Sequence, residues 1–381
     1  MKNLEKLLEY NSGKSVKIKI KDKKAIFINN SNEFSGDTVL KIINFVNSLH
    51  KTYKNVKIPI EFRFNNIYIK DKLSYVFFEC ICYLLMKHYQ HMVFIYWKPQ
   101  KNILTDGIFS SPLKLLDGTN HKSALKYPDK FESDLYRNHF RKIISGDKKD
   151  TNYLGELFQA LDSFLKYFSI VKEYRDQIAE VIAELVGNAC EHAYTDCLLD
   201  IDITNDHLKK IESVVQDGVY YGINITVVNF SDTLLGTNVK KKLYENNLTS
   251  ERYLSLGKAY QYHKSQFSEQ YTEDDFFNIS AFQDKISGRS RYSESGGTGL
   301  TKLIRSLQEK SDVDSCYVVS GNRSVIFYKE KLEYNEQNWL GFNEKKDFLN
   351  AIPDSDINLP CHAYVPGTAY NLNFVMKRED E

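Results

Sequence analysis

Residues 182–192 read IAELVGNACEH and carry a regular pattern of polar side chains. Glu180, Glu184, Asn188 and His192 recur at intervals of four residues, so they form one polar stripe along a helix. Apolar side chains flank this stripe, which predicts that the helix is well covered. A covered carboxylate and a covered amide are costly without polar partners. A site that contains metal, water and phosphate would supply those partners.

Glu184 and Asn188 suit complementary roles in such a site. A glutamate can accept a proton from an attacking water or hydroxyl group. The amide oxygen of Asn188 is a hard, neutral ligand that suits Mg²⁺. The spacing E-x-x-x-N alone is more typical of a solvated helix face, so the assignment depends on two later segments.

The second segment, residues 295–304, reads SGGTGLTKLI. Gly296, Gly297 and Gly299 allow positive φ angles and a close approach of the backbone to a ligand. An apolar helical spacing follows at once, so the N-terminus of a helix would offer unpaired N–H groups to phosphate, and Lys302 adds charge nearby. A flexible loop with a helix cap is the alternative interpretation.

The third segment is a predicted strand at residues 223–229, INITVVN, which ends in a polar turn at residues 230–233. By itself this is an ordinary structural pattern. Taken in order, however, the E-x-x-x-N helix, the strand and the G-G-T-G-L helix start resemble the nucleotide-binding domain of the GHKL superfamily. That superfamily includes gyrase, the heat-shock chaperone ATPase, histidine kinases and MutL. The resemblance covers about residues 155–375.

The resemblance implies an α/β fold, namely a two-layer α/β sandwich in which helices cover a mixed sheet, and it implies ATP and Mg²⁺ as ligands. Residues 184–192 look like the N box, which implies Glu184 as the general base and Asn188 as the Mg²⁺ ligand. Residues 230–296 then correspond to the ATP lid, and residues 330–366 are an insertion. Phosphate contacts are implied for the second glycine box and its neighbours: Gly296, Gly297, Thr298, Gly299, Leu300 and Lys302.

Two positions depart from the family pattern, one in each glycine box. The family's first glycine box, D-x-G-x-G, has no close match, because Asn229 stands where the adenine-reading aspartate belongs. The Asn carbonyl can still accept a hydrogen bond from the adenine amino group, and Asp232 is a second candidate. Thr301 replaces a glycine that is common in the second box. Thr368, after Gly367, is similar to the threonine that lies beside adenine.

Residues 1–100 predict a smaller, basic α/β domain. Its apolar segments alternate as strands and helices, an order that favours a layered α/β arrangement and faintly resembles STAS domains. Frequent Pro, Gly, Lys and Asp predict a connector at residues 101–152, and the ATP-binding domain then spans residues 153–381. Within it, the pattern predicts two helices over 153–194, a hairpin over 316–328 and a last strand over 368–376.

The net charge of +1 conceals an asymmetry between the two parts of the chain. Residues 1–150 carry 27 Lys+Arg and 15 Asp+Glu, whereas the rest carry 24 and 35. A basic half can bind nucleic acid or another anion. Dispersed lysines are also typical of a solvated face or of a complement to the acidic half.

The composition indicates the cellular compartment in which we expect the protein. With 42% hydrophobic and 27% charged residues, the chain is typical of a soluble protein. The apolar run at 75–86 is shorter than the roughly 20 residues that span a bilayer. The N-terminal residues show no secretory signal, and the six scattered cysteines are interpreted as buried thiols. We therefore expect a cytoplasmic protein with no membrane partner.

Three functions fit this pattern. In the first, Mg²⁺-dependent ATP hydrolysis drives lid closure or dimerisation, with an output through the N-terminal domain. In the second, the chain is a soluble Ser/Thr kinase of the anti-sigma-factor type, in which Glu184 deprotonates a hydroxyl group of a protein partner. In the third, it senses ATP without hydrolysis, although a general base is then not needed. A sensor histidine kinase is disfavoured, because His139 lacks the acidic neighbour that is usual at a phosphoacceptor.

Overall fold

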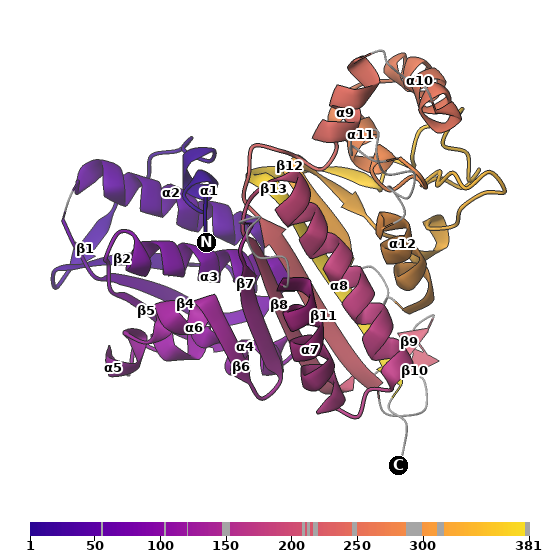
Figure 1. Ribbon diagram of the computed structural model, residues 1–381. Helices are drawn as coiled ribbons and strands as arrows, with labels where there is room; N and C mark the ends of the chain where they lie inside the picture. Colours follow the sequence, from indigo (N-terminus) through magenta and orange to yellow (C-terminus); the bar gives the residue numbers. More distant parts are fainter. Residues whose placement is uncertain are drawn as a thin grey trace.

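The computed structural model describes residues 1–54, 56–102, 104–119, 121–146, 153–207, 210–211, 214–215, 220–245, 250–286, 299–310 and 316–377. Within these residues, two larger sheets lie next to each other and helices pack around both (Figure 1). A small third sheet pairs β9 (Lys210–Ile211) with β10 (Val214–Val215). The prediction of an α/β fold is confirmed.

The first sheet comes from the N-terminal part of the chain and follows the order predicted for residues 1–100. A short helix, α1 (Lys6–Glu9), precedes it. Strands β2, β3 and β5 run parallel to β4, whereas β1 is antiparallel to β2. Helical crossovers connect the parallel strands, as parallel pairing requires. In chain order the elements are β1 (Lys19–Lys21), β2 (Lys24–Asn29), β3 (Glu33–Phe34), α2 (Gly36–Thr52), β4 (Ile60–Ile69), α3 (Lys72–Lys87) and β5 (Val93–Pro99).

Aromatic packing fixes α2 and α3 on one face of this sheet. The ring centroid of Phe62 on β4 lies 5.0 Å from that of Phe78 on α3 and 6.3 Å from that of Phe45 on α2. Asp71 caps α3 by accepting a hydrogen bond from the Ser74 N–H at 2.7 Å. The apolar run at 75–86 is therefore a buried helix. Among the described residues, no helix is both long and apolar enough to span a membrane.

The second sheet has six strands in the order β12-β13-β11-β8-β7-β6. Every neighbouring pair is antiparallel, so the prediction of a mixed sheet is wrong for this part of the chain. The reason is that no helical crossover joins neighbouring strands in the same direction. The strands are β6 (Ser133–Tyr136), β7 (His139–Ile144), β8 (Cys197–His207), β11 (Tyr220–Asn229), β12 (Tyr317–Ile326) and β13 (Asn358–Lys377).

Three sequence-based boundaries differ from the structure. The last strand, predicted over 368–376, is β13 (Asn358–Lys377), which includes the end of the predicted insertion at 330–366. The predicted connector, 101–152, contains β6 and β7, which extend the six-stranded sheet. The predicted hairpin at 316–328 is instead one strand, β12, because Gly321, with φ of 64°, forms an irregularity in the pairing with β13 rather than a turn. The connector also holds α4 (Thr105–Ser110), the 3₁₀ helix η1 (Pro112–Leu116), α5 (His121–Ala124) and α6 (Tyr127–Glu132).

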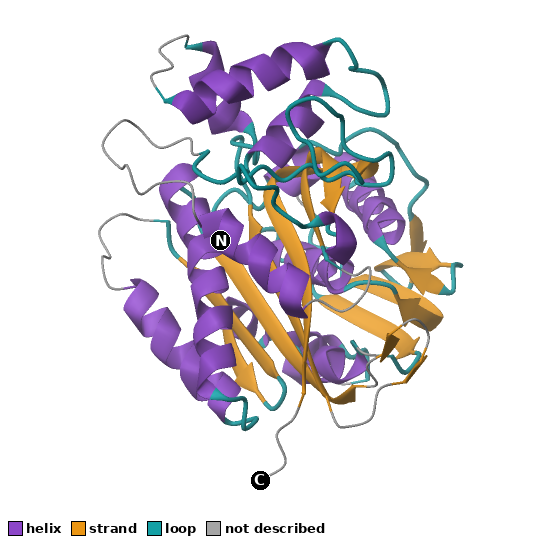
Figure 2. Ribbon diagram, turned by 90° about the vertical axis from the view of Figure 1, so that its right-hand side faces the viewer, coloured by secondary structure: helices purple, strands orange, loops and turns teal. Residues whose placement is uncertain are grey.

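Helices cover both faces of the six-stranded sheet, so this sheet lies between two helical layers rather than under one (Figure 2). Ile225 on β11 packs with Ile182 on the face that carries α8 (Lys172–His192). On the opposite face, Val228 packs with side chains from α3. We call these the α8 face and the α3 face. The α8 face also carries α7 (Tyr153–Lys166) and α12 (Gly299–Lys310).

Buried ion pairs join helix α3 to the face of the six-stranded sheet on which it packs. Lys72 at the start of α3 lies 2.5 Å from Asp200 on β8 and also pairs with Asp202. Arg141 on β7 donates to Asp200 at 2.6 Å and pairs with Glu79 on α3. All five side chains are buried. Burial alone would lower the pKa of Lys72, but the two aspartates raise it, so the lysine stays charged.

His139 belongs to the same network, on β7. Its imidazole lies between Asp200, at 2.9 Å, and Asp134, at 3.2 Å, and is fully buried. Burial acts to lower the pKa of His139, but the neighbouring carboxylates outweigh it and raise the pKa. His139 thus has two acidic neighbours, Asp134 and Asp200, which the residues next to it in sequence did not indicate.

The predicted lid and the predicted insertion pack together. We call this assembly the lid unit; it consists of residues 230–245, 250–286 and 329–357, and the other residues of the predicted lid (230–296) lie outside the described residues. Arg252 lies 3.6 Å from the Trp339 ring, and His263 lies 2.7 Å from the Phe348 carbonyl oxygen. Figure 1 shows the unit at the upper right, beyond the end of the six-stranded sheet. Its helices are α9 (Thr237–Tyr244), α10 (Glu251–Lys264), α11 (Glu273–Ser280) and the 3₁₀ helix η2 (Lys329–Lys331).

Candidate functional site

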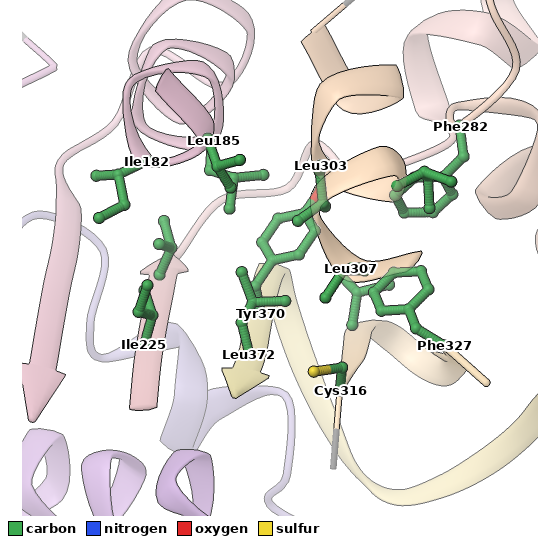
Figure 3. Close-up of a cluster of buried hydrophobic side chains, with 14 of the residues drawn as sticks. Ile182, Leu185, Ile225, Phe282, Leu303, Leu307, Cys316, Phe327, Tyr370 and Leu372 are labelled. Atoms are coloured by element: carbon green, nitrogen blue, oxygen red, sulfur yellow. The ribbon is translucent and has the colours of Figure 1, made fainter. Parts of the chain in front are cut away.

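The α8 helix holds Glu184 and Asn188 above the six-stranded sheet. Its apolar side chains, including Ile182 and Leu185, point into the core beneath (Figure 3). Glu184 and Asn188 are both half-buried, so solvent can reach part of each residue. The predicted polar stripe is therefore present on a helix whose other side is covered.

The α12 helix, which follows the glycine-rich segment, packs beside α8. Leu303 and Leu307 are fully buried against the same core (Figure 3). Lys302 on its first turn lies 3.0 Å from Glu180, one turn before Glu184 on α8. Gly299 and Leu300 form the start of α12. The predicted phosphate-contacting residues Gly296, Gly297 and Thr298 lie outside the described residues.

Tyr370 on β13 lies between the two helices. In Figure 3 its ring extends from the strand toward Leu303 on α12 and Leu185 on α8. Burial raises the pKa of Tyr370, and the negative charge of the nearby Glu184 carboxylate raises it further. The phenol therefore stays protonated, and Tyr370 is a neighbour of Glu184. Tyr370 is two residues after Thr368 on the same strand, so the sequence could have placed both side chains on one face of the sheet.

Asn229 and Thr368 are direct partners in the ladder between β11 and β13. Side chains alternate between the two faces along a strand. Asn229 therefore shares the α8 face with Ile225, and Thr368 shares it with Tyr370. The two predicted adenine-facing residues, which are far apart in sequence, thus come together at one end of the sheet, on the face that carries Glu184.

Ser320 on β12 is a polar neighbour of this pair that the sequence did not indicate. Its hydroxyl donates to the Gly367 carbonyl at 2.6 Å and lies 3.5 Å from the Thr368 hydroxyl. It also accepts from the Leu235 N–H at 2.9 Å, where the chain enters the lid unit. Ser320 was hidden because its segment was predicted to be a hairpin turn.

Asp232, the alternative adenine-reading residue, faces a different part of the molecule. Its exposed carboxylate accepts a hydrogen bond from the Tyr10 hydroxyl at 2.7 Å and pairs with Lys6 on α1. Hydrogen bonds from Lys6 and Tyr10 lower the pKa of this carboxyl. The side chain thus holds the N-terminal segment and is not directed to Asn229 and Thr368.

Gly367 shapes the end of the sheet where Asn229 and Thr368 meet. Its φ of 92° is unfavourable for other residues, and an added Cβ would lie 2.4 Å from the Asn229 carbonyl oxygen. We expect Gly367→Ala to lower the free energy of unfolding by more than about 1 kcal/mol, which urea unfolding of the full chain would measure.

Gly155 on α7 provides the control for this prediction. An added Cβ there meets nothing within 4 Å. Gly155→Ala is therefore expected to stabilise the helix by up to about 1 kcal/mol. Equal unfolding midpoints for the two variants would contradict the proposed role of Gly367.

The described residues contain no group of three His, Cys, Asp or Glu side chains that could hold a metal ion. Five of the six cysteines are buried and Cys361 is half-buried. No protein-family model, curated protein or solved structure matches the chain. The function must therefore be inferred from the fold and from the arrangement of these side chains.

Proposed function

We propose that the chain binds ATP with Mg²⁺ on the α8 face of the six-stranded sheet and hydrolyses it. The proposal rests chiefly on one observation. The N-box-like helix, the start of α12 and the Asn229–Thr368 pair are separated in sequence, yet all three lie on the same face of one sheet. This convergence supports a divergent GHKL domain in the two-layer part formed by the sheet and its α8 face.

Each side chain has a role in this proposal. Glu184 accepts the proton of the attacking water, and Asn188 supplies an oxygen to Mg²⁺. Because Mg²⁺ usually keeps several waters and bonds to substrate phosphates, one or two protein ligands suffice. This donor set fits the absence of a three-residue metal cluster among the described residues. The start of α12, with Gly299, Leu300 and Lys302, faces the phosphates.

Asn229 and Thr368 are the adenine-facing pair in this proposal. An Asn carbonyl can accept a hydrogen bond from an exocyclic amino group, and the threonine hydroxyl can donate or accept. Asp232 is left out of the site because Lys6 and Tyr10 already occupy its carboxylate. We therefore expect the base to be read by an amide rather than by a carboxylate.

A conformational change caused by ATP hydrolysis would reach the rest of the chain through the elements that contact the six-stranded sheet. The lid unit is joined to β12 by Arg323, which donates to Asp275 at 2.7 Å. Helix α3, which packs on the N-terminal sheet, is joined to the six-stranded sheet by the ion pairs of Lys72 with Asp200 and of Arg141 with Glu79. Lid closure or dimerisation would thus act through polar contacts on both faces of the six-stranded sheet. We place this activity in the cytoplasm.

Asn188→Ala is expected to remove the Mg²⁺-dependent part of ATP binding, because the oxygen ligand is lost while alanine preserves the helix. Titration of the full chain with ATP, in Mg²⁺ and in EDTA, measures that part. Gln159→Ala, which removes an exposed amide from the neighbouring helix α7, is the matched control. If Asn188→Ala keeps the full difference between Mg²⁺ and EDTA, Asn188 is not the metal ligand.

The experiment that tests the function itself is ATP binding and phosphate release by the unaltered chain. Binding with release supports the ATPase. Transfer of radioactive phosphate to a protein hydroxyl would instead indicate the Ser/Thr kinase, and binding without either would indicate the sensor. A chain that binds no nucleotide would overturn the proposal.

A further inference from the structure

A cavity of about 810 Å³ lies in the N-terminal sheet, in a different part of the chain from α8. Cavities of about 300–1,000 Å³ are typical of small-ligand sites. Its walls are formed by β4, by β5 and by the loop that follows η1. The side chains that carry the chemistry are Arg63, Asn65, Asn66, Tyr96, Trp97 and Lys98.

A bulge in β4 shapes the cavity. Arg63 pairs with Tyr96 on β5, but the next pair joins Asn66 to Lys98, so β4 holds one residue more than β5 between them. Such a bulge redirects side chains and is common beside functional sites. Asn65 and Asn66 are consecutive, and both are exposed at this point rather than alternating between the faces.

The aromatic wall of the cavity is held in place. The Tyr96 hydroxyl donates to the Gly118 carbonyl at 3.2 Å, and an added Cβ at Gly118 would lie 2.2 Å from the Tyr96 ring. Arg63 lies 5.8 Å from the centroid of the same ring, and its Nε donates to Glu61 at 3.0 Å. The ring and the guanidinium are therefore positioned before any ligand binds.

Of the remaining polar groups of the cavity, Lys98 and the carboxamides of Asn65 and Asn66 are available to a ligand, whereas the Asp117 carboxylate accepts hydrogen bonds from the Thr119 N–H and hydroxyl groups. Within the residues that the structure describes, Lys98 has no carboxylate within ion-pair distance, and the carboxamides of Asn65 and Asn66 have no hydrogen bond. Residues 1–150 carry 27 Lys+Arg against 15 Asp+Glu, so the surrounding surface attracts anions.

We propose that this cavity binds a nucleotide unit, that is, a flat base together with its phosphate. The half-buried ring of Trp97, which lines the cavity, provides a surface on which a base can stack. The carboxamides of Asn65 and Asn66 can donate to and accept from the edge of the base. Lys98 pairs with the phosphate, and Arg63, whose Nε and Nη2 already donate to Glu61, adds its Nη1 group. The same chemistry is present in a free nucleotide and in a single-stranded nucleic acid.

Trp97 allows binding to be measured at this cavity alone. The chain has two tryptophans, Trp97 and Trp339, and Trp339 lies buried in the lid unit. In the full chain with Trp339→Phe, fluorescence therefore reports only on Trp97. We expect quenching when either AMP and UMP or ten-residue single strands of dA and dT are added. Tighter binding of the strands would identify nucleic acid as the source, and equal affinity per site would identify the free nucleotide.

Variants test the residues assigned to the phosphate. Arg63→Gln and Lys98→Gln are each expected to weaken binding about tenfold, whereas Lys51→Gln, an exposed lysine on α2 outside the cavity, leaves it unchanged. No quenching by any probe, or equal affinity in all three variants, would overturn the proposal. Because Glu184→Ala does not alter this cavity, the quenching persists in that variant whether or not the α8 face hydrolyses ATP.

Discussion

Glu184→Ala is expected to lower the rate of ATP hydrolysis at least about a hundredfold, because general-base catalysis typically contributes a factor of about 10² to 10⁴. ATP binding should remain, since the carboxylate acts on water rather than on the nucleotide. The fold should remain as well, because Glu184 is half-buried and alanine favours a helix. Phosphate release and ATP titration on the same preparation measure the two effects.

Glu173→Ala is the matched control, since it removes an exposed carboxylate from the first turn of the same helix. It should keep the parental rate. Hydrolysis by Glu184→Ala at the parental rate would show that the base has been assigned wrongly. Loss of binding together with hydrolysis would instead assign Glu184 to the nucleotide or its metal.

Lys72→Met is expected to lower the free energy of unfolding by about 3–5 kcal/mol, because removal of one partner leaves buried charges uncompensated. Lys72 is the cation shared by Asp200 and Asp202, and all three are buried. Methionine has a similar length, so the loss of charge rather than of volume is tested. Urea unfolding of the full chain measures the change.

The control for this prediction lies two residues earlier in the sequence. Lys70 forms an exposed pair with Glu33 at 2.9 Å, and Lys70→Met should change stability by less than about 1 kcal/mol. Adding Asp202→Leu to Lys72→Met should restore part of the lost stability, because one of the unpaired carboxylates is then removed. Similar losses in the two lysine variants would contradict a buried, charged Lys72.

The sequence could predict the elements whose burial follows a regular period. The helical spacing around Glu184 placed α8, and the strand predicted at 223–229 lies within β11. The resemblance named Asn229 and Thr368 as residues of one site, and the register of β11 and β13 pairs them. For these positions, local pattern and tertiary structure agree.

Other positions could not be read locally, because their partners lie far away in sequence. The sequence did not predict strand β7, because His139 and Arg141 point toward buried carboxylates. Two polar residues on the buried side of the strand remove the usual alternation of apolar and polar residues. The sequence allowed Asp232 as an adenine-reading residue, but its carboxylate is ion-paired with Lys6, which is far away in sequence. Nor does any motif indicate that Trp339 would stack with Arg252 in the lid unit.

The ion pairs across the α3 face also limit how the molecule can be divided. A fragment that begins at residue 153 would lack two strands of the six-stranded sheet, and it would lack Lys72 and Arg141, the cations that neutralise Asp200. Its sheet would present bare carboxylates and a new edge to solvent. Gene fusion or excision at this boundary would therefore separate side chains that are ion-paired in the full chain.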